Sequence, residues 1–261
     1  MPETTENLMR LISITAALLL GSATTALPQS YPARPIRLVV PFAPGGNIDI
    51  TARAIAPGLA ELLGQTIVID NRGGAGGLIG TELVAKAVPD GYTLVIGSSG
   101  VLTVAPSLYS KMPYDPLKDF TSLGLLSYVP IVLVVGAGHP ARTPKDLIAL
   151  AKQRAGKMIM ASAGAGTTNQ LAGELFQMET GVKFVHVPYK GSGPALVEVM
   201  GGQVDMLFDQ LSASATYIKG GRLRALAVAA DRRNAAVPDV PTMAESGIKN
   251  CKACGTCERG E

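Results

Sequence analysis

The residues best placed to do chemistry lie in a loop that joins a buried strand to a helix. The strand, residues 36–40, is mostly Ile, Leu and Val, as a strand covered on both faces requires. Pro41 and Pro44 end it, and Gly45 and Gly46 remove the side chains that would keep a ligand from the backbone. The helix that follows presents free N–H groups and the positive end of its dipole. Since the loop holds no Lys or Arg, it predicts an anion site formed by backbone, which favours binding over catalysis.

The start of this helix contains a carboxylate that suits two roles. Asp49 or Thr51 can cap the helix, whose apolar positions run through residues 52–63. Asp49 is equally suited to contact a ligand held in the loop. Both interpretations of Asp49 therefore stay open from the sequence alone.

A second strand–loop–helix unit repeats this pattern later in the chain. The strand at 158–161 is followed by small residues from Ser162 to Asn169, and a helix is expected from Gln170. Hydroxyl groups of Ser162, Thr167 and Thr168 add to the backbone N–H groups, and Ser98 and Ser99 follow the strand at 93–96. Because ligands of open α/β sheets bind at the carboxyl ends of strands, we expect all three loops to line one cleft.

Strand-like and helix-like segments alternate along the chain. This alternation predicts an α/β protein, with a parallel or mixed sheet and helices on both faces. Apolar residues make up 47% of the chain and charged residues 16%, so a sizeable core is available. The expected strands are 36–40, 66–70, 93–96, 131–135, 158–161, 184–187, 205–208 and 223–229, and the expected helices are 78–87, 144–154, 171–178, 195–200 and 212–219.

The net charge argues against a nucleic-acid partner, and the N-terminus indicates export from the cytoplasm. A net charge of +3 without any Trp gives neither the basic footprint nor the stacking surface of a nucleic-acid-binding protein. Residues 1–26 are typical of a signal peptide, with Arg10 before an apolar stretch at 11–20 that is too short to span a bilayer. A start at Met9 gives a cleaner signal than Met1, and a buried helix is the alternative. We expect an exported protein.

The three cysteines, Cys251, Cys254 and Cys257, have the C-x2-C-x2-C spacing of an iron–sulfur ligand run. No fourth cysteine exists, no histidine is near in sequence, and the surrounding residues are charged rather than apolar. We therefore expect no metal or cofactor, and interpret 249–261 as an atypical tail, such as a foreign or frame-shifted end.

Enzyme signatures are weak in this chain. Gly74–Gly80 approximates a dinucleotide-binding fingerprint, but its spacing is wrong and no acidic residue closes a later strand to bind ribose. His139 and His186 do not accompany a G-x-S-x-G serine elbow and are interpreted as structural. We therefore expect no enzyme. An NAD(P)-binding enzyme stays a remote alternative, and a ligand sensor or regulatory module a nearer one.

Several motifs together resemble those of the TctC-like, or Bug-type, solute-binding receptors of tripartite tricarboxylate transporters. They occur in consistent order from about residue 31 to residue 247. The matching segments are 41–46 with Asp49, 71–72 with 74–77, 89–92, 114–116 with 118–120, 171–176, 186–191, 201–205 and 238–242.

The resemblance implies a two-lobed, Venus-flytrap fold of the type II periplasmic-binding class. Lobe one would comprise 31–128 plus 226–248, and lobe two 129–225. Family members normally continue beyond the region of Gly247, so lobe one is expected to be incomplete at its C-terminus.

The resemblance also implies function. It predicts a periplasmic monomer that captures a small carboxylate, such as a di- or tricarboxylate, an acidic amino acid or an aromatic acid, and delivers it to transmembrane permease subunits. Asp209 would bind a ligand amine or a water, or make a structural contact. The implied ligand-binding residues are Phe42, Gly45, Gly46 and Asp49 from lobe one, Ser162, Gly164, Thr167, Thr168 and Asn169 from lobe two, with Ser98, Tyr189 and Asp209 lining the cleft.

Overall fold

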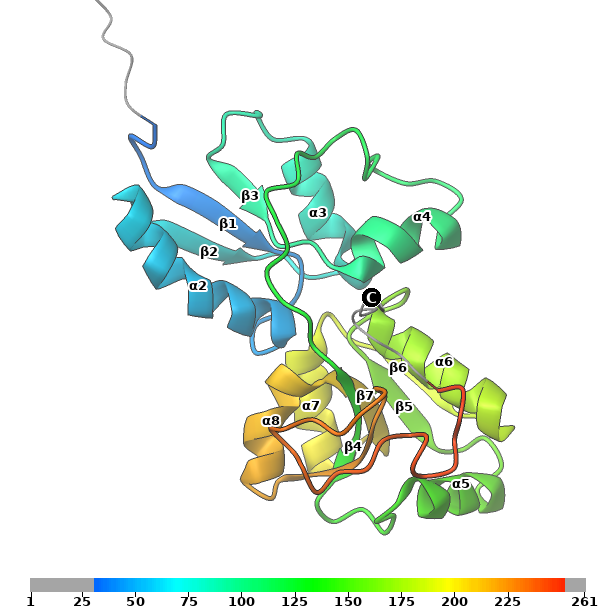
Figure 1. Ribbon diagram of the computed structural model, residues 1–261. Coiled ribbons are helices and arrows are strands. Elements are labelled where there is room, and N and C mark those ends of the chain that lie inside the picture. Colours follow the sequence, from blue (N-terminus) through cyan, green and yellow to red (C-terminus); the bar gives the residue numbers. More distant parts are fainter. Residues whose placement is uncertain (1–30, 252–261) are drawn as a thin grey trace, which may run out of the picture. The chain divides into compact units, whose positions relative to one another are not determined.

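The computed structural model describes residues 31–251 and contains two β-sheets, each with its own helices (Figure 1). Both sheets belong to the unit that begins at Arg34. The expected signal peptide, 1–26, and Cys254 and Cys257 lie outside the described residues. Within the described part of the chain, no helix combines the length and the hydropathy that a membrane crossing needs.

The first sheet is parallel, and its central strand is β1. Ile36, Val39 and Val40 of this strand are fully buried, which confirms the two-sided burial expected from its apolar run. Because the strands are parallel, the loops that follow them leave from the same edge of the sheet. The strand order is β2-β1-β3, with β1 at Ile36–Val40, β2 at Ile67–Asn71 and β3 at Thr93–Val95.

A helical segment follows each strand of this sheet. The first, α2, begins at Asn47 with Gly46 as its N-cap residue, so neither Asp49 nor Thr51 caps it. The sequence predicted a later start for this helix, but Asn47 and Ile48 already belong to its first turn. The segments are α2 at Asn47–Leu63, η1 at Ala75–Gly77, α3 at Leu78–Ala85, the π-helical turn η2 at Gly100–Val104 and α4 at Ala105–Leu108.

The second sheet is mixed, as the alternation of segments allowed. Strand β5 pairs in parallel with β6 and β7, whereas β4 pairs antiparallel with β7 and β8. The order is β6-β5-β7-β4-β8, with β4 at Ile131–Gly136, β5 at Ile159–Ser162, β6 at Val185–Pro188, β7 at Met206–Gln210 and β8 at Leu223–Val228. The helices are α5 at Pro144–Gln153, α6 at Thr168–Thr180, α7 at Ser192–Gly201 and α8 at Leu211–Lys219.

A separate apolar core forms on each face of the second sheet. Phe208 of β7 packs against Phe176 of α6, with ring centroids 5.6 Å apart. Leu207, the preceding residue of β7, belongs instead to the core that includes Leu196 and Leu211, of α7 and α8. This alternation along one strand covers both faces of the sheet with helices and confirms the predicted α/β class.

The division of the chain differs from the expected one near its C-terminus. Residues 226–248 were assigned to lobe one, but β8 forms an edge of the second sheet beside β4. The segment after β8 stays there, because Met243 and Ile248 are buried in the core that contains Phe176. The Val228 N–H donates to the Pro241 carbonyl at 2.8 Å. The apolar residues of this stretch therefore complete the second lobe.

Two helical glycines give opposite expectations for substitution by alanine. A Cβ at Gly80 of α3 would lie 2.6 Å from the Arg72 carbonyl oxygen and 2.7 Å from the Pro41 Cα, whereas a Cβ at Gly58 of α2 meets nothing within 4 Å. We expect Gly80→Ala to lower the free energy of unfolding by about 2 kcal/mol through overpacking. Gly58→Ala should raise it by roughly 0.5–1 kcal/mol, as ordinary helix propensity predicts.

Urea denaturation of the full chain and both variants measures these changes. A Gly80→Ala variant as stable as Gly58→Ala would contradict the close approach of α3 to the ends of β1 and β2.

Candidate functional site

A cleft of about 510 Å3 is lined by segments that follow strands of both sheets. On the first sheet these are the loop after β1 with the start of α2, and the segment after β3. On the second sheet they are the segments after β5 and β6 and Gln210, the last residue of β7. Ligand sites of α/β sheets occupy this position. The polar lining includes Asn47, Ser98, Thr168, Asn169, Ser192 and Gln210.

The first turns of α2, α6 and α7 contribute to this lining, and so does Gln210, the N-cap residue of α8, whereas the Leu211 N–H at the start of α8 donates to the Pro130 carbonyl oxygen at 2.9 Å. None of these helices has a side-chain hydrogen bond at its N-cap residue. By contrast α5, a helix that follows β4 and does not line the cleft, has a full capping box between Thr143 and Asp146. The first-turn N–H groups at the cleft are thus left without a side-chain cap, and the helix dipoles add positive potential there.

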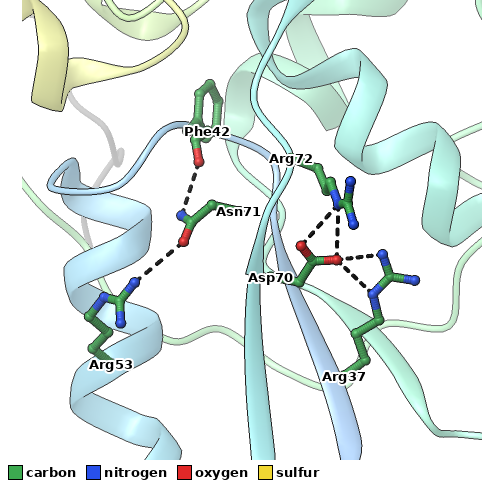
Figure 2. A network of polar contacts seen from close by, with 6 residues as sticks. All are labelled: Arg37, Phe42, Arg53, Asp70, Asn71 and Arg72. Atoms are coloured by element: carbon green, nitrogen blue, oxygen red, sulfur yellow. Dashed lines mark hydrogen bonds and ion pairs between the residues drawn. The ribbon is translucent and has the colours of Figure 1, made fainter.

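The loop after β1 is held in place from behind by an amide side chain. Asn71, at the end of β2, donates from Nδ2 to the Phe42 carbonyl oxygen at 3.1 Å and to Asp49 Oδ1 at 3.0 Å. Figure 2 shows the Asn71 amide between the Phe42 carbonyl and the Arg53 guanidinium. The loop backbone is therefore fixed before any ligand arrives.

Asp49 serves this loop rather than the cleft. Its buried carboxylate accepts from the Gly45 N–H at 2.9 Å and from Arg53 Nε at 3.0 Å. Burial by itself would raise the pKa of Asp49, but the hydrogen bonds from Arg53, Gly45 and Asn71 outweigh it and hold this pKa below its usual value. Asp49 is not among the residues that line the cleft, so its ligand-binding role has no geometric support.

The basic side chains near this loop are also engaged elsewhere. Figure 2 shows the Asp70 carboxylate between Arg37 and Arg72, whose Nε atoms lie 2.8 and 2.9 Å from its oxygens. Arg53 pairs with Asp49. None of these arginines lines the cleft, so none of them offers a ligand there a charged partner.

The loops of the two sheets touch each other directly. The Ala43 N–H donates to the Lys190 carbonyl oxygen at 2.8 Å, and Ser212 Oγ donates to Asn47 Oδ1 at 2.6 Å. A Cβ at Gly193, in the first turn of α7, would lie 2.0 Å from the Pro44 carbonyl oxygen. Glycine at position 193 therefore permits the start of α7 to lie against the loop after β1.

The loop after β5 satisfies its own polar groups before α6 begins. Ser162 is fully buried, and its Oγ lies 3.1 Å from both the nitrogen and the oxygen of Gly164 and 2.7 Å from His186 Nε2. Thr167 Oγ1 donates to the Gly164 carbonyl oxygen at 2.7 Å. Ser162 and Gly164 thus shape the loop, and burial of Ser162 removes any nucleophilic role beside His186.

Asp209 lies behind the lobe-two side of the cleft, fully buried at the end of β7. Ser214 Oγ donates to its Oδ2 at 2.5 Å, and Asn169 Nδ2 lies 3.3 Å from its Oδ1. Burial raises the pKa of Asp209 to about 6, against the opposing effect of hydrogen bonds from Ser214, Ser192, the Gln210 backbone and Asn169. The carboxylate contacts side chains of the lining without lining the cleft itself.

The expected site residues divide into two groups by position. Phe42, Gly46, Ser98, Thr167, Thr168 and Asn169 line the cleft. Gly45, Asp49, Ser162, Gly164, Tyr189 and Asp209 do not; Tyr189 instead packs against the core under α7 and α8. The structure adds Asn47, Ser192 and Gln210, which sequence reasoning missed. Gln210 neighbours Asp209, and strand alternation turns one of two such neighbours toward the opposite face.

The features considered for catalysis or metal binding lie elsewhere. No residue of the Gly74–Gly80 stretch lines the cleft. His139 Nδ1 accepts from the Ala141 N–H at 3.2 Å. Cys251 is buried, and burial raises the pKa of its thiol to about 12. Among residues 31–251 no cluster of His, Cys, Asp and Glu side chains is suited to hold a metal ion.

Solved structures with the same fold define the class of protein. R. palustris Rpa4515 with adipate matches with a TM-score of 0.83 and 40% identity, over 86% of this chain and 75% of that one. MatC from Rhodopseudomonas palustris with bound malate matches with a TM-score of 0.82 and 36% identity, over 86% of this chain and 76% of that one. The periplasmic binding protein BugD matches with a TM-score of 0.82 and 40% identity, over 86% of this chain and 75% of BugD. The fold is that of a periplasmic solute-binding protein, as expected.

Sequence comparison identifies the family. The model of the family described as "Tripartite tricarboxylate transporter family receptor" (TctC) matches residues 51–257, and the chain belongs to this family. Protein BugT of Bordetella pertussis is 42% identical over 245 residues, which cover 92% of this chain and 75% of BugT. An Agrobacterium vitis protein is 41% identical over 221 residues, which cover 85% of this chain and 64% of that protein. The family match continues past Gly247, where the resemblance was expected to end.

Asp209 makes the stability of the protein depend on pH. Its folded pKa, about 6, lies above its usual 3.8, so the folded state favours the protonated form. The stabilisation that Asp209 gives the folded state is fully present below pH 3.8 and is lost as the pH rises through about 6. Complete ionisation should cost on the order of 3 kcal/mol.

Asp209→Asn cannot ionise, so the stability of this variant relative to the unchanged protein should increase by about 2 kcal/mol between about pH 4 and about pH 7.5. Denaturant unfolding of both proteins at both pH values measures the difference. A difference for Asp209→Asn that does not change with pH would show that this carboxylate ionises as freely in the folded state as in the unfolded one.

Proposed function

We propose that this chain is an extracytoplasmic receptor that captures a small carboxylate and delivers it to the permease of a tripartite tricarboxylate transporter. The observation that carries the proposal is the gathering of the uncapped N-termini of α2, α6 and α7 around one cleft. Backbone N–H groups and helix dipoles suit a carboxylate without an ion pair. Relatives of 36–40% identity solved with adipate and malate support the same ligand class.

Capture and delivery would use the two lobes in sequence. The ligand enters the cleft, and contacts between the loops, such as that between Ala43 and Lys190, hold the lobes together around it. A ligand that binds both lobes favours the closed arrangement by its differential affinity. The closed receptor then presents the ligand to transmembrane permease subunits. We propose a monomer located in the periplasm, which catalyses no reaction, needs no cofactor and binds no nucleic acid.

Carboxylate binding by the full chain is tested by thermal unfolding and calorimetry with mono-, di- and tricarboxylates, acidic amino acids and aromatic acids. Ligand at about 100 times its Kd should stabilise the protein by roughly 2.7 kcal/mol. A cooperative transition that no carboxylate shifts would contradict the proposal. Uptake of the labelled ligand into vesicles that hold the permease, with and without the receptor, separates transport from a sensor or regulatory role.

Gly46→Val tests whether the ligand approaches the start of α2. A Cβ at position 46 would lie 3.4 Å from Ser192 Cβ, and the backbone at Gly46 is extended, so valine fits while its methyl groups occupy the cleft between α2 and α7. We expect the Kd for the carboxylate to rise at least about tenfold, a loss of about 1.4 kcal/mol, with little change in Tm.

Gly138→Val is the matched control, because Gly138 is exposed, has nothing within 4 Å of its Cβ position and does not line the cleft. Equal affinities in the two variants would remove the start of α2 from the binding site.

A further inference from the structure

A buried carboxylate lies directly behind the polar lining of the cleft on its lobe-two side. Asp209 is fully buried, and its side-chain partners come from three helices: Asn169 of α6, Ser192 of α7 and Ser214 of α8. Asn169 and Ser192 also line the cleft. Along either of these two residues, a single side chain separates the Asp209 carboxyl group from a ligand held in the cleft.

The carboxylate of Asp209 has no positive partner among residues 31–251, because the groups that donate to it are hydroxyl, amide and backbone groups. Strands β4 and β5, which flank β7, contain no titratable residue. Each titratable residue of α6, α7 and α8 lies at least three positions beyond the contact with Asp209, about 4.5 Å or more along its helix. These residues are Glu174, Glu179, Glu198, Tyr217 and Lys219.

The protonation state of Asp209 decides what its neighbours can offer the cleft. An ionised carboxylate only accepts hydrogen bonds, so it draws the Ser192 hydroxyl proton and the Asn169 amide toward itself. A protonated carboxyl group can donate to Ser192 Oγ, which frees the Ser192 hydroxyl to donate into the cleft. Burial raises the pKa of Asp209 to about 6, so both forms are within reach close to neutral pH.

The charge of the ligand acts in the same direction. A carboxylate held at the first turns of α6 and α7 lies one side chain away from Asp209. Because two nearby negative charges disfavour each other, the bound ligand favours the protonated form of Asp209. The coupling is reciprocal, so a ligand that prefers this form draws a proton onto the protein as it binds.

We propose that Asp209 is a positioning residue that carries a proton whenever the carboxylate is bound, so that the receptor takes up a proton as it captures its ligand. This inference rests on the proposed function of the cleft and adds a proton as a second ligand. The proton comes from solvent, binds a carboxyl oxygen of Asp209 and returns to solvent when the ligand leaves.

Calorimetric titration of the full chain with adipate, malate and benzoate tests this coupling. Near pH 6.5 binding should take up roughly half a proton, measured as a difference in apparent enthalpy between PIPES and imidazole buffers. The Kd should rise several-fold from about pH 6 to about pH 8, a range in which these acids are already largely ionised. A Kd that is constant over this range, or a release of protons on binding, overturns the inference.

Asp209→Asn removes the titrating group and keeps a side chain of the same shape. Both the proton uptake and the rise of the Kd with pH should disappear in this variant, whereas a merely structural effect would change the Kd equally at both pH values. Proton uptake that persists in Asp209→Asn would assign the coupling to another group and overturn the inference.

Asp205→Asn is the matched control, in which both effects should persist. Asp205 directly precedes β7, at the end of the strand opposite to Asp209. Its carboxylate accepts from the Ile159 N–H at 2.7 Å and does not line the cleft. Loss of the proton uptake in Asp205→Asn as well would show that the coupling does not depend on Asp209 in particular.

A measurement on the unchanged protein decides the matter if Asp209→Asn does not fold. The carboxyl carbon resonance of Asp209, followed by NMR, should titrate at a higher pH in the complex than in the free protein, and equal midpoints overturn the inference. If a carboxylate binds without proton uptake, the receptor function stands and the coupling is wrong. If no carboxylate binds to folded protein, the proposed function itself fails.

Discussion

Every α-helix begins with N–H groups that its own backbone cannot satisfy, and this constraint organises the cleft. Where α5 begins, the side chains of Thr143 and Asp146 satisfy them. Where α2, α6 and α7 begin, no side chain caps the helix, and all three starts lie at one cleft. A carboxylate is the natural complement of such a surface, because its oxygens accept hydrogen bonds and its charge suits the dipoles.

Side chains of the first lobe fix the orientation of the backbone groups in the loop after β1. Asn71 and Asp49 hold the loop after β1 through its own carbonyl and N–H groups, so their polar atoms are used for support. The Ala43–Lys190 hydrogen bond and the missing side chain at Gly193 let the loops of the two sheets meet. Charged side chains such as Asp49 and Arg53 therefore support the loop without lining the cleft, whose surface consists of backbone, hydroxyl, amide and apolar groups.

Local pattern in the sequence was sufficient for the strands. Strand β1 has the predicted bounds, and the ends of β2 and β7 shift by one or two residues. The same local pattern does not reveal which way a side chain points at a strand end, so Asp209 was expected in the cleft and Gln210 was missed. Local sequence pattern also could not predict that residues 226–248 pack on the second sheet, because burial of Met243 and Ile248 depends on contacts with distant helices. The sequence also does not reveal the partners of Ser162, whose hydroxyl is satisfied by its own loop and by His186.

The most direct test of the account is an NMR titration of the full chain with a carboxylate that it binds, following assigned backbone amide resonances. If the helix N-termini bind the carboxylate, the amide protons of Asn47, Thr168 and Ser192 shift downfield and saturate with the measured Kd, while the amide of Asp146, already capped by Thr143, stays unchanged. Saturable carboxylate binding that leaves the first-turn amides of α2, α6 and α7 unmoved would contradict it.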